Sequence, residues 1–592
     1  MMTTRGANYG GLRVSFLRTS FWCAAIVLGA ADAWATRFTM NPDGISYLDI
    51  GDAYWRGDWR MAINGYWSPF YSWILGLFLK VLKPSPYWEY PVVHLVNFLI
   101  YVGALVCFEF FLTEFIRNCS ASGRVPGDAS EVTLPEWVWR ALGYSLFIWT
   151  SLVLITIAAV SPDLFLSGLV YLASGLVLKI SGRTASRRAF VLLGAVLGCG
   201  YLAKAVMFPL AFVFLATVML SMDNLRKGAL RAGTAALVFL LFAVPWVAAL
   251  SRAKGHLTVG DSGRLNYLAC VNGVDCWFPG DSGRMRCGDI GSVWGVDEIE
   301  FPGGKMLRHP VQRIFDAPAT YQFAGPVGGT YPFWYDPSYW QEGIKPHFDL
   351  RDQASALRRG MQSYWKLCSS VSLLLNVTAA FCILLLLTPK RLACIKLSAA
   401  KWPVALPALS ALGLYALVQV EYRYIAPFVL ILWLAAFAGV WLRSYERSRT
   451  LVAIISISIT ATTLLSAVVF EVQNPVAWKS ADPVYWQAAM DLRQSGIRPG
   501  DKLAVIASGP MGANVPFIAR LARLQVVAQV NRRDRFFASL PSTQARVTEA
   551  IARTGAKAIL TFAEPPPAQS GTRWKPLELT NYYVCLPEQE KP

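Results

Sequence analysis

Eleven separate stretches of this 592-residue chain are apolar enough to form membrane-spanning helices. A spanning helix needs about 20 mostly apolar residues, and a chain with many such segments folds in lipid. The stretch 189–220 is too long for one span and contains Lys204 and Pro209, so we interpret it as a helical hairpin with Lys204 in its turn. The predicted spans are residues 14–36, 91–115, 137–160, 164–180, 189–201, 206–220, 229–250, 364–388, 404–420, 424–441 and 451–470.

The charge composition agrees with a membrane protein. Only 16% of the residues are charged and 55% are hydrophobic, whereas a soluble chain usually has about 25% charged residues. The net charge of +18 would suggest nucleic-acid binding in a soluble protein, but membrane proteins concentrate Lys and Arg in their cytoplasmic loops. We therefore exclude an ordinary soluble enzyme and expect membrane lipids, not nucleic acid, as partners.

One further apolar run, residues 67–82, decides the predicted topology. If this run does not cross the membrane, the basic clusters between the spans fall on one side, as the positive-inside rule requires. We therefore predict that residues 67–82 form a re-entrant or interfacial helix. The N-terminus is then cytoplasmic, and the loop 37–66, the loop 251–363 and the chain after residue 470 lie on the outer side.

The chain after residue 470 has a soluble α/β pattern. Short apolar runs at 502–508, 525–530, 556–562 and 582–586 predict strands, and segments 483–495, 515–524 and 543–554 predict helices. The predicted fold class is an α-helical polytopic membrane protein with about 11 spans plus a re-entrant helix and a C-terminal extracytoplasmic α/β domain. The membrane domain covers residues 1–470, with its external loops 37–66 and 251–363, and the α/β domain covers residues 471–592.

Four of the eleven cysteines lie on the predicted outer side, where disulfides can form. Cys270 could pair with Cys276, or Cys276 with Cys287. Their spacing does not exclude zinc, but no His lies near it at ligand spacing, so we prefer a disulfide and predict no metal there.

Two aspartates at the predicted outer boundary are candidate catalytic residues, because a charge beside the bilayer is costly to keep. Asp43 follows the first span, and its carboxylate could act as a general base; the alternative is an N-cap of a short helix. In such a helix Asp49 and Asp52 share a face, and Asp52 can pair with Arg56. Asp163 follows Ser161-Pro162, which is also an ordinary helix start.

Two cations map to the same boundary. Lys204 could neutralise a phosphate, or its ammonium could merely extend to the interface. Arg423, in Glu421-Tyr-Arg-Tyr424, has a planar fork suited to phosphate, although a Glu421–Arg423 pair could bind nothing. Together the four positions suit a substrate with a lipid tail, a phosphate and a polar head group. They do not suit a channel, which would present rings of like groups.

These motifs, in this order, resemble the GT-C superfamily of integral membrane glycosyltransferases, especially the bacterial relatives of protein O-mannosyltransferases and aminoarabinose transferases. The resemblance covers roughly residues 14–441. It is carried by Pro42-Asp-Gly-Ile-Ser-Tyr-Leu48, the Trp-Ser-Pro stretch 67–71, Ser-Pro-Asp163, the Gly-rich segment 194–204 and Tyr-Arg-Tyr424.

The resemblance implies transfer of a sugar from a polyprenyl-phosphate donor to an extracytoplasmic glycan, lipid or protein acceptor, with inversion. Asp43 would be the general base, and Asp163 would orient the acceptor or a cation. Lys204, Arg423 and Glu421 would form the donor phosphate site. No cofactor is required, although Asp43 with Asp163 could hold a divalent cation. The expected location is the bacterial inner membrane, with the C-terminal domain in the periplasm.

Two further alternatives remain at this stage. The aromatic block 329–340 contains Tyr331, Trp334, Tyr335 and Trp340, which either stack against an acceptor or stiffen a folded lid. The whole chain could also be a lipid-carrier flippase or transporter that catalyses no glycosyl transfer, or a non-enzymatic assembly protein whose external domain recruits a partner.

Overall fold

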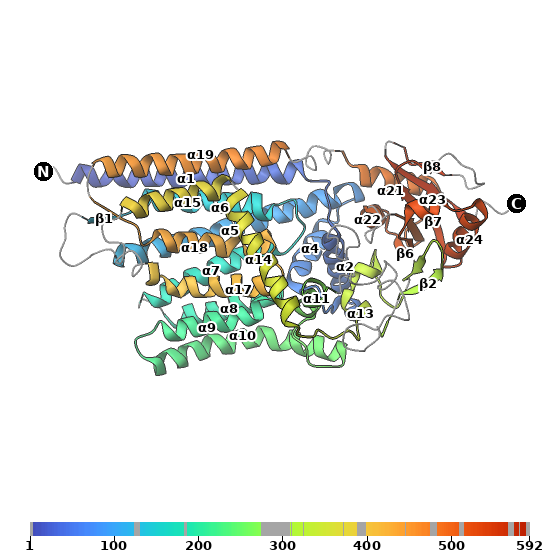
Figure 1. Cartoon of the computed structure of the whole chain (residues 1–592), viewed down its shortest axis with the longest axis horizontal. Coiled ribbons are helices and arrows are strands. Elements are labelled where there is room, and N and C mark those ends of the chain that lie inside the picture. The colour runs from blue at the N-terminus through green and yellow to red at the C-terminus, as the bar shows by residue number, and fades with distance from the viewer. Residues whose placement is uncertain are drawn as a thin grey trace.

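A long bundle of parallel and antiparallel helices carries a β-sheet at one of its ends (Figure 1). The computed structural model describes residues 4–122, 131–182, 186–273, 308–309, 311–323, 325–370, 372–387, 398–443, 446–473, 482–507, 514–565, 574–578 and 580–587. The bundle helices are α1 (Thr4–Ala35), α5 (Pro86–Ser122), α6 (Glu136–Trp149), α7 (Asp163–Ser181), α8 (Arg187–Ala203), α9 (Met207–Leu220), α10 (Leu225–Lys254), α15 (Ser372–Leu387), α17 (Trp402–Val418), α18 (Tyr422–Phe437) and α19 (Glu446–Gln473).

Each of the eleven predicted apolar segments lies on a bundle helix, but the ends differ. The predicted span 137–160 is helical only to Ile155, as α6 and the π-helix η1 (Thr150–Ile155), because Thr156 adopts a positive φ of 66°. The predicted span 364–388 lies on α14 (Leu350–Ser370) and α15, which are bent by 78°.

By length and composition, six of the described helices could cross a membrane, or seven if α14 and α15 form one span. Four further apolar helices are shorter, and one of them is α4 (Pro69–Leu82). At about 1.5 Å per residue its 14 residues extend about 21 Å, less than the hydrocarbon thickness of about 30 Å. The structure therefore supports a multi-pass membrane protein, and the count of eleven spans stays a prediction.

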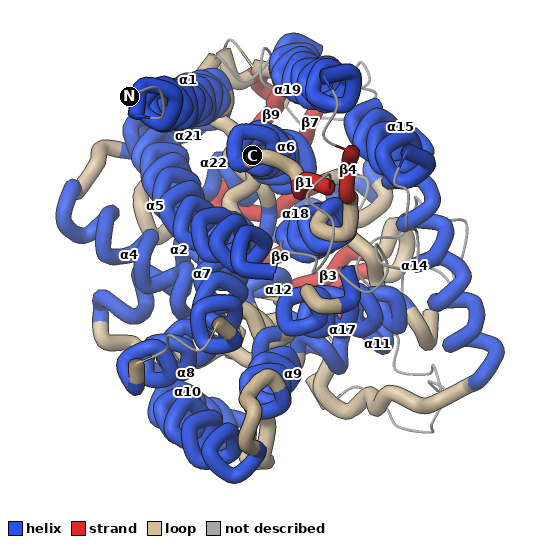
Figure 2. Tube along the Cα trace, turned by 90° about the vertical axis from the view of Figure 1, so that its left-hand side faces the viewer, coloured by secondary structure: helices blue, strands red, loops and turns tan. Residues whose placement is uncertain are grey.

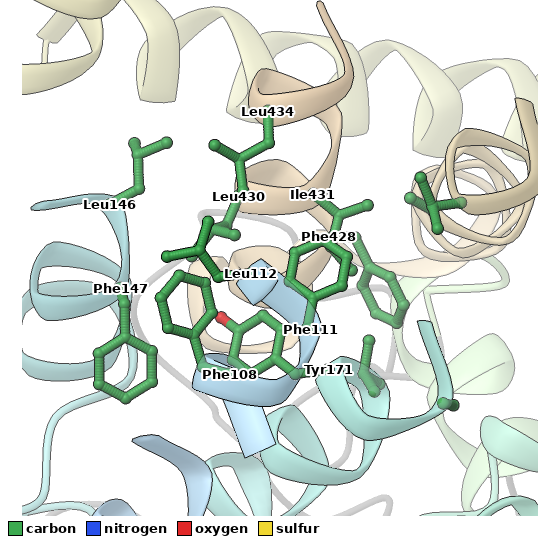
Figure 3. Close-up of a cluster of buried hydrophobic side chains, with 14 of the residues drawn as sticks. Phe108, Phe111, Leu112, Leu146, Phe147, Tyr171, Phe428, Leu430, Ile431 and Leu434 are labelled. Carbon is green, nitrogen blue, oxygen red and sulfur yellow. The ribbon is translucent and has the colours of Figure 1, made fainter. Parts of the chain in front are cut away.

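Aromatic and branched side chains fill the centre of the bundle (Figure 3). Phe108 of α5 contacts Phe147 of α6 and Tyr171 of α7, with ring centroids 4.9 and 5.3 Å apart. Viewed along the bundle, α18 lies among α6, α7 and α17 (Figure 2). Because lipid tails are as apolar as these side chains, close van der Waals packing holds the bundle together, and this packing fixes the positions of the helix ends.

A seven-stranded mixed sheet occupies the other end, in the order β2-β3-β6-β5-β7-β9-β8. The strands are β2 (Gln312–Phe315), β3 (Thr320–Gln322), β5 (Lys502–Ile506), β6 (Gln525–Val530), β7 (Ala556–Phe562), β8 (Lys575–Pro576) and β9 (Tyr582–Cys585). The central strands β6, β5 and β7 are parallel and the others are antiparallel.

The sheet is not built from the chain after residue 470 alone. The hairpin β2–β3 comes from the predicted external loop 251–363 and pairs with β6 through Thr320–Val530. Such pairing joins residues about 200 positions apart and cannot be read from local pattern.

Helices cover both faces of this sheet. On one face lie α21 (Val484–Gln494) and α22 (Val515–Ala522), and on the other lie α23 (Arg533–Ala538) and α24 (Pro541–Ala552). The α22 side also faces the bundle, because Tyr90 of α5 donates a hydrogen bond of 2.7 Å to the Phe517 carbonyl. A separate antiparallel pair, β1 (Glu131–Thr133) with β4 (Trp441–Arg443), lies at the far end of the bundle (Figure 1).

Two short helices connect the bundle to the sheet. Helix α2 (Pro42–Arg56) ends at Gly57, whose φ of 74° lies in the left-handed region that favours glycine, and α3 (Trp59–Ala62) follows. Helix α2 packs on α4, and Gly51 allows the close approach, since a Cβ there would lie 2.7 Å from the Ser72 carbonyl oxygen. The short helices α11 (Ser262–Cys270), α12 (Pro332–Tyr335) and α13 (Pro337–Trp340) complete this layer.

Candidate active site

The four charged candidates line one cavity of about 350 Å³ between the bundle and the sheet. Asp43 lies in the first turn of α2, Asp163 is the first residue of α7, Lys204 caps the end of α8 and Arg423 lies in the first turn of α18. The helix ends bring these residues together, although Asp43 and Arg423 are about 380 positions apart in the sequence.

Backbone geometry explains why Lys204 reaches this point. Its φ of −158° and ψ of 129° end α8 and separate it from α9. Helix α8 approaches α10 closely at Gly194, where a Cβ would lie 2.3 Å from the Ala235 carbonyl oxygen. The glycine-rich segment before Lys204 therefore serves helix packing, which fixes where the lysine emerges.

The charges form one balanced network. Lys204 Nζ lies 2.6 Å from Asp163 Oδ1, and Arg423 Nε lies 3.6 Å from Asp163 Oδ2. Arg423 Nη2 lies 3.5 Å from Asp43 Oδ2. Two carboxylates and two cations give a formal charge of zero, which is what an enclosed site needs when no ligand is bound.

The two aspartates differ in access. The Asp163 side chain is only 2% exposed and is held by both cations and by the Ser161 hydroxyl at 2.9 Å. The Asp43 side chain is 23% exposed and has one weak ion pair. Asp43 can therefore reach a ligand in the cavity, whereas Asp163 positions Lys204 and Arg423.

The structure decides among the alternative roles of these residues. The N-cap interpretation of Asp43 is wrong, because Asn41 is the N-cap residue of α2. Lys204 does not extend outward, since its Nζ lies 3.3 Å from the centroid of the Tyr424 ring and beside Asp163. The ion pairs of Arg423 are with Asp43 and Asp163.

Glu421 does not line the cavity. Its carboxylate accepts a 2.7 Å hydrogen bond from Gln419 Nε2, and Gln419 does line the cavity. Glu421 therefore contacts the cavity wall through Gln419 and is not placed as a direct phosphate ligand. A direct contact between its carboxylate and a phosphate would also be repulsive.

The rest of the wall is neutral and rich in tyrosine. Tyr47 lies one helical turn after Asp43, a spacing from which the sequence could have indicated it. Nothing in the local sequence indicates Tyr415, Gln419 or Asn266. The neutral wall includes Tyr47, Tyr66, Trp67, Ser68, Ser161, Ser262, Asn266, Tyr415, Gln419 and Tyr424.

Tyr415 has a free hydroxyl in this wall. Its side chain is buried, its ring packs against Tyr424 at 5.5 Å, and its Oη has no hydrogen-bond partner in the described part of the chain. An unpaired buried hydroxyl costs about 1–3 kcal/mol. A ligand that accepts a hydrogen bond would recover this energy.

The aromatic block 329–340 supports the site without forming its wall. Tyr331, Trp334, Tyr335 and Trp340 are all buried, and none lines the cavity. A ring that stacks on a sugar must leave one face open, so the arrangement favours the lid alternative over acceptor stacking. Trp334 alone reaches the charged network, donating from Nε1 to Asp43 Oδ1 at 3.3 Å.

The cysteine prediction falls largely outside the described residues, which do not include Cys276 and Cys287. Cys270 lies at the end of α11, with its Sγ 3.3 Å from Gln419 Oε1. Either predicted disulfide stays a prediction.

The donor set fits a divalent cation poorly. Within the described residues no three His, Cys, Asp or Glu side chains are grouped for metal binding. The two carboxylates that would be the metal ligands, Asp43 and Asp163, already form ion pairs with Lys204 and Arg423. These side chains supply the positive charge that a metal ion would supply.

The comparisons with known proteins gave only structural neighbours. No family model matches the sequence, and no curated protein matches it. The structure is similar to ArnT from Cupriavidus metallidurans in the apo state, with a TM-score of 0.48 and 11% identity over 97% of this chain and 99% of that chain. ArnT bound to undecaprenyl phosphate gives a TM-score of 0.47 and 12% identity over 96% and 97% of the two chains.

A third neighbour is the archaeal oligosaccharyltransferase AglB from Archaeoglobus fulgidus in complex with an inhibitory peptide and a dolichol-phosphate. Its TM-score is 0.47, with 11% identity over 92% of this chain and 69% of that chain.

Proposed function

We propose that this chain is a membrane glycosyltransferase of the GT-C type, which transfers a sugar from a polyprenyl-phosphate donor to an extracytoplasmic acceptor. The observation that carries the proposal is the accessible Asp43 beside the cation pair Lys204 and Arg423 in one enclosed cavity. A base and a phosphate-binding pair, side by side, are the two groups that such a transfer needs.

The donor phosphate would lie between Lys204 and Arg423, which Asp163 holds in place. A cavity of about 350 Å³ is within the range of small-ligand pockets, about 300–1,000 Å³. It suits a sugar phosphate head group, and the polyprenyl chain would lie outside it among the helices. The neutral polar wall, with Asn266 and Gln419, would then face the sugar hydroxyls.

Asp43 would act as the general base. An acceptor hydroxyl attacks the anomeric carbon as Asp43 takes its proton, and the bond from that carbon to the phosphate oxygen breaks. The electron pair leaves with the polyprenyl phosphate, whose new negative charge Lys204 and Arg423 stabilise. This is one displacement, so it inverts the anomeric configuration and needs no covalent enzyme intermediate.

The proposed orientation follows the positive-inside rule. We place the cavity and the sheet on the outer side of a bacterial inner membrane and the β1–β4 end of the bundle in the cytoplasm. The basic residues Arg187, Arg188 and Arg226 lie in the first turns of α8 and α10, at that end of the bundle.

A direct assay tests the proposed function. The purified chain in lipid nanodiscs would be incubated with undecaprenyl phosphates carrying different radiolabelled sugars and with glycan, lipid and peptide acceptors. A new glycosidic bond together with release of undecaprenyl phosphate supports the proposal. Translocation of the labelled donor in liposomes without any new bond would overturn it in favour of a flippase.

Tyr415→Phe is expected to weaken binding of undecaprenyl phosphate about tenfold. A hydrogen bond to a charged group contributes about 1.5–3 kcal/mol, and Tyr415, whose hydroxyl has no partner in the described part of the chain, lines the cavity that would hold the phosphate. Binding would be measured by native mass spectrometry or microscale thermophoresis. Tyr364→Phe is the control, because its hydroxyl donates to the Leu412 carbonyl outside the cavity; equal effects of the two substitutions would contradict a role for Tyr415.

Binding of undecaprenyl phosphate is expected to weaken as the pH rises above about 8. Lys204 lies in the turn between α8 and α9, where burial lowers the pKa of its ammonium to about 8 while Asp163 opposes that shift. The protonated form binds phosphate, so affinity is full below this pKa and falls above it. The other charged groups facing it are Arg423 and Asp43, and Tyr424 lies against it. Lys204→Arg stays charged, so its affinity should not fall in this range; a parallel fall would contradict the assignment.

A further inference from the structure

A buried ionic cluster joins the sheet layer to the helix that carries Asp43. Arg520 of α22 is 4% exposed. Its Nη1 lies 2.7 Å from both Asp49 Oδ1 and Asp52 Oδ2, and its Nε lies 2.6 Å from Glu89 Oε1. Asp49 and Asp52 are one turn apart on α2, and Glu89 is in the first turn of α5. One guanidinium therefore contacts three carboxylates on two helices.

The same cluster fixes the aromatic block. Asp49 accepts hydrogen bonds from the Thr330 backbone N–H at 2.6 Å and from its hydroxyl at 2.9 Å. The Thr330 carbonyl in turn accepts from the Val526 N–H of β6 at 2.9 Å. Asp49 thus holds the start of the segment that contains Trp334 against both α2 and the sheet.

From this segment the contacts lead to the proposed base. Trp334 donates from Nε1 to Asp43 at 3.3 Å, and its carbonyl accepts from the Ser46 hydroxyl at 3.0 Å. Helix α2 is therefore attached to the aromatic block at its start, through Asp43 and Ser46, and at its middle, through Asp49. Arg520 neutralises the charge of the Asp49 carboxylate, which makes the second of these attachments.

The energetic cost of burying these charges indicates that the cluster positions α2 more than it stabilises the fold. Burial raises the pKa of the Asp49 carboxyl, and the adjacent Arg520 guanidinium opposes that rise. Buried ion pairs stabilise less than well-packed apolar side chains of the same volume, and removal of one partner leaves an uncompensated charge. Such ion pairs instead fix the rotation of a helix about its axis. If α2 turned by one residue, it would rotate by about 100°, and Asp49 and Asp52 would no longer contact the Arg520 guanidinium.

We propose that Arg520 is a positioning residue for the proposed sugar transfer, which sets the rotation of α2 and the contact of Trp334 with Asp43 from the sheet layer. The sheet layer is then part of the catalytic unit and not only an appended domain. Arg520 acts through Asp49 and Thr330 and touches no substrate. This inference rests on the proposed function.

The test compares Arg520→Met with a matched control, Arg493→Met. Arg493 lies in the same helix layer, and its Nη2 contacts the Leu521 carbonyl at 3.3 Å. For Arg520→Met we expect faster backbone hydrogen exchange in residues 42–56 and 330–340 and an unchanged rate in the turn around Lys204. We expect kcat to fall at least tenfold, while the Kd for undecaprenyl phosphate stays within twofold, because Lys204 and Arg423 are untouched. Arg493→Met should match the wild type.

A charge-neutral variant separates positioning from stability. Arg520→Met with Asp49→Asn removes one positive and one negative charge, Glu89 keeps its ion pair with Arg523, and Asp52 is 30% exposed, so this variant should fold even where Arg520→Met does not. If positioning is the role, this variant keeps a low kcat and fast exchange in α2. Recovery of wild-type kcat, unchanged exchange in α2, or equal losses of kcat and lipid affinity would each overturn the proposal. If the wild type forms no glycosidic bond, the proposed function fails, and hydrogen exchange in α2 still decides whether Arg520 positions that helix.

Discussion

Asp43→Asn is expected to lower the rate of sugar transfer about 10³-fold while leaving the Kd for undecaprenyl phosphate within about twofold. General-base catalysis typically contributes 10²–10⁴-fold. The asparagine side chain has the same size and can still accept the Trp334 hydrogen bond, but its amide cannot take a proton. Single-turnover transfer and lipid binding would be measured on the same sample. The binding measurement matters because Lys204 and Arg423, not Asp43, are the proposed phosphate ligands.

Two controls accompany this substitution. Asp43→Glu keeps a carboxylate and should retain measurable transfer, because only its position changes. Asp316→Asn alters an exposed aspartate in the sheet layer, with 93% of its side chain accessible, and should have no effect. Full activity in Asp43→Asn would show that another group is the base.

Arg423→Gln is expected to lower kcat about 10²–10³-fold and to weaken donor binding as well. Loss of one group that stabilises the charge of the transition state typically has this effect. Arg423 also bridges Asp43 and Asp163 through Nη2 and Nε. Arg423→Lys should recover only part of the activity, because an ammonium is a point charge and cannot contact both carboxylates in the same geometry. The kinetic constants and the lipid Kd would be measured together.

The thermal stability of Arg423→Gln needs its own control. Among the described residues, the substitution leaves Lys204 as the one cation paired with the buried Asp163. Adding Asp163→Asn removes this imbalance and should raise the melting temperature of the double variant without restoring transfer. Wild-type transfer in either variant would contradict the role proposed for Arg423.

The local sequence pattern is sufficient to predict a helix or strand where the whole segment lies in one kind of surroundings, such as lipid or an apolar core. The eleven apolar segments coincide with bundle helices over most of their length, because a helix surrounded by lipid or by other apolar helices needs only length and hydrophobicity. The predicted strands 525–530 and 556–562 coincide with β6 and β7, because strands buried on both faces are short continuous apolar runs. The candidate residues Asp43, Asp163, Lys204 and Arg423 were likewise identified from their position at segment ends.

Local pattern fails where the partner comes from elsewhere in the chain. The predicted partner of Asp52 was Arg56, one turn away, whereas the structure pairs Asp52 with Arg520. The aromatic block was open to two interpretations, and its burial under the sheet layer favours the lid. The free hydroxyl of Tyr415 also depends on contacts that no local spacing describes.

The sequence by itself determined that this chain is a membrane protein and where its apolar helices lie, and it predicted which few charges at the helix ends carry chemistry. These properties depend on the transfer of each segment from water to lipid, which is a sum over neighbouring residues. Only the tertiary structure decided that the four charges share one cavity, that Asp43 is accessible while Asp163 is enclosed, and that Arg520 connects the sheet to α2. These depend on contacts between residues hundreds of positions apart, whose geometry is set by packing of the whole core and not by any single segment.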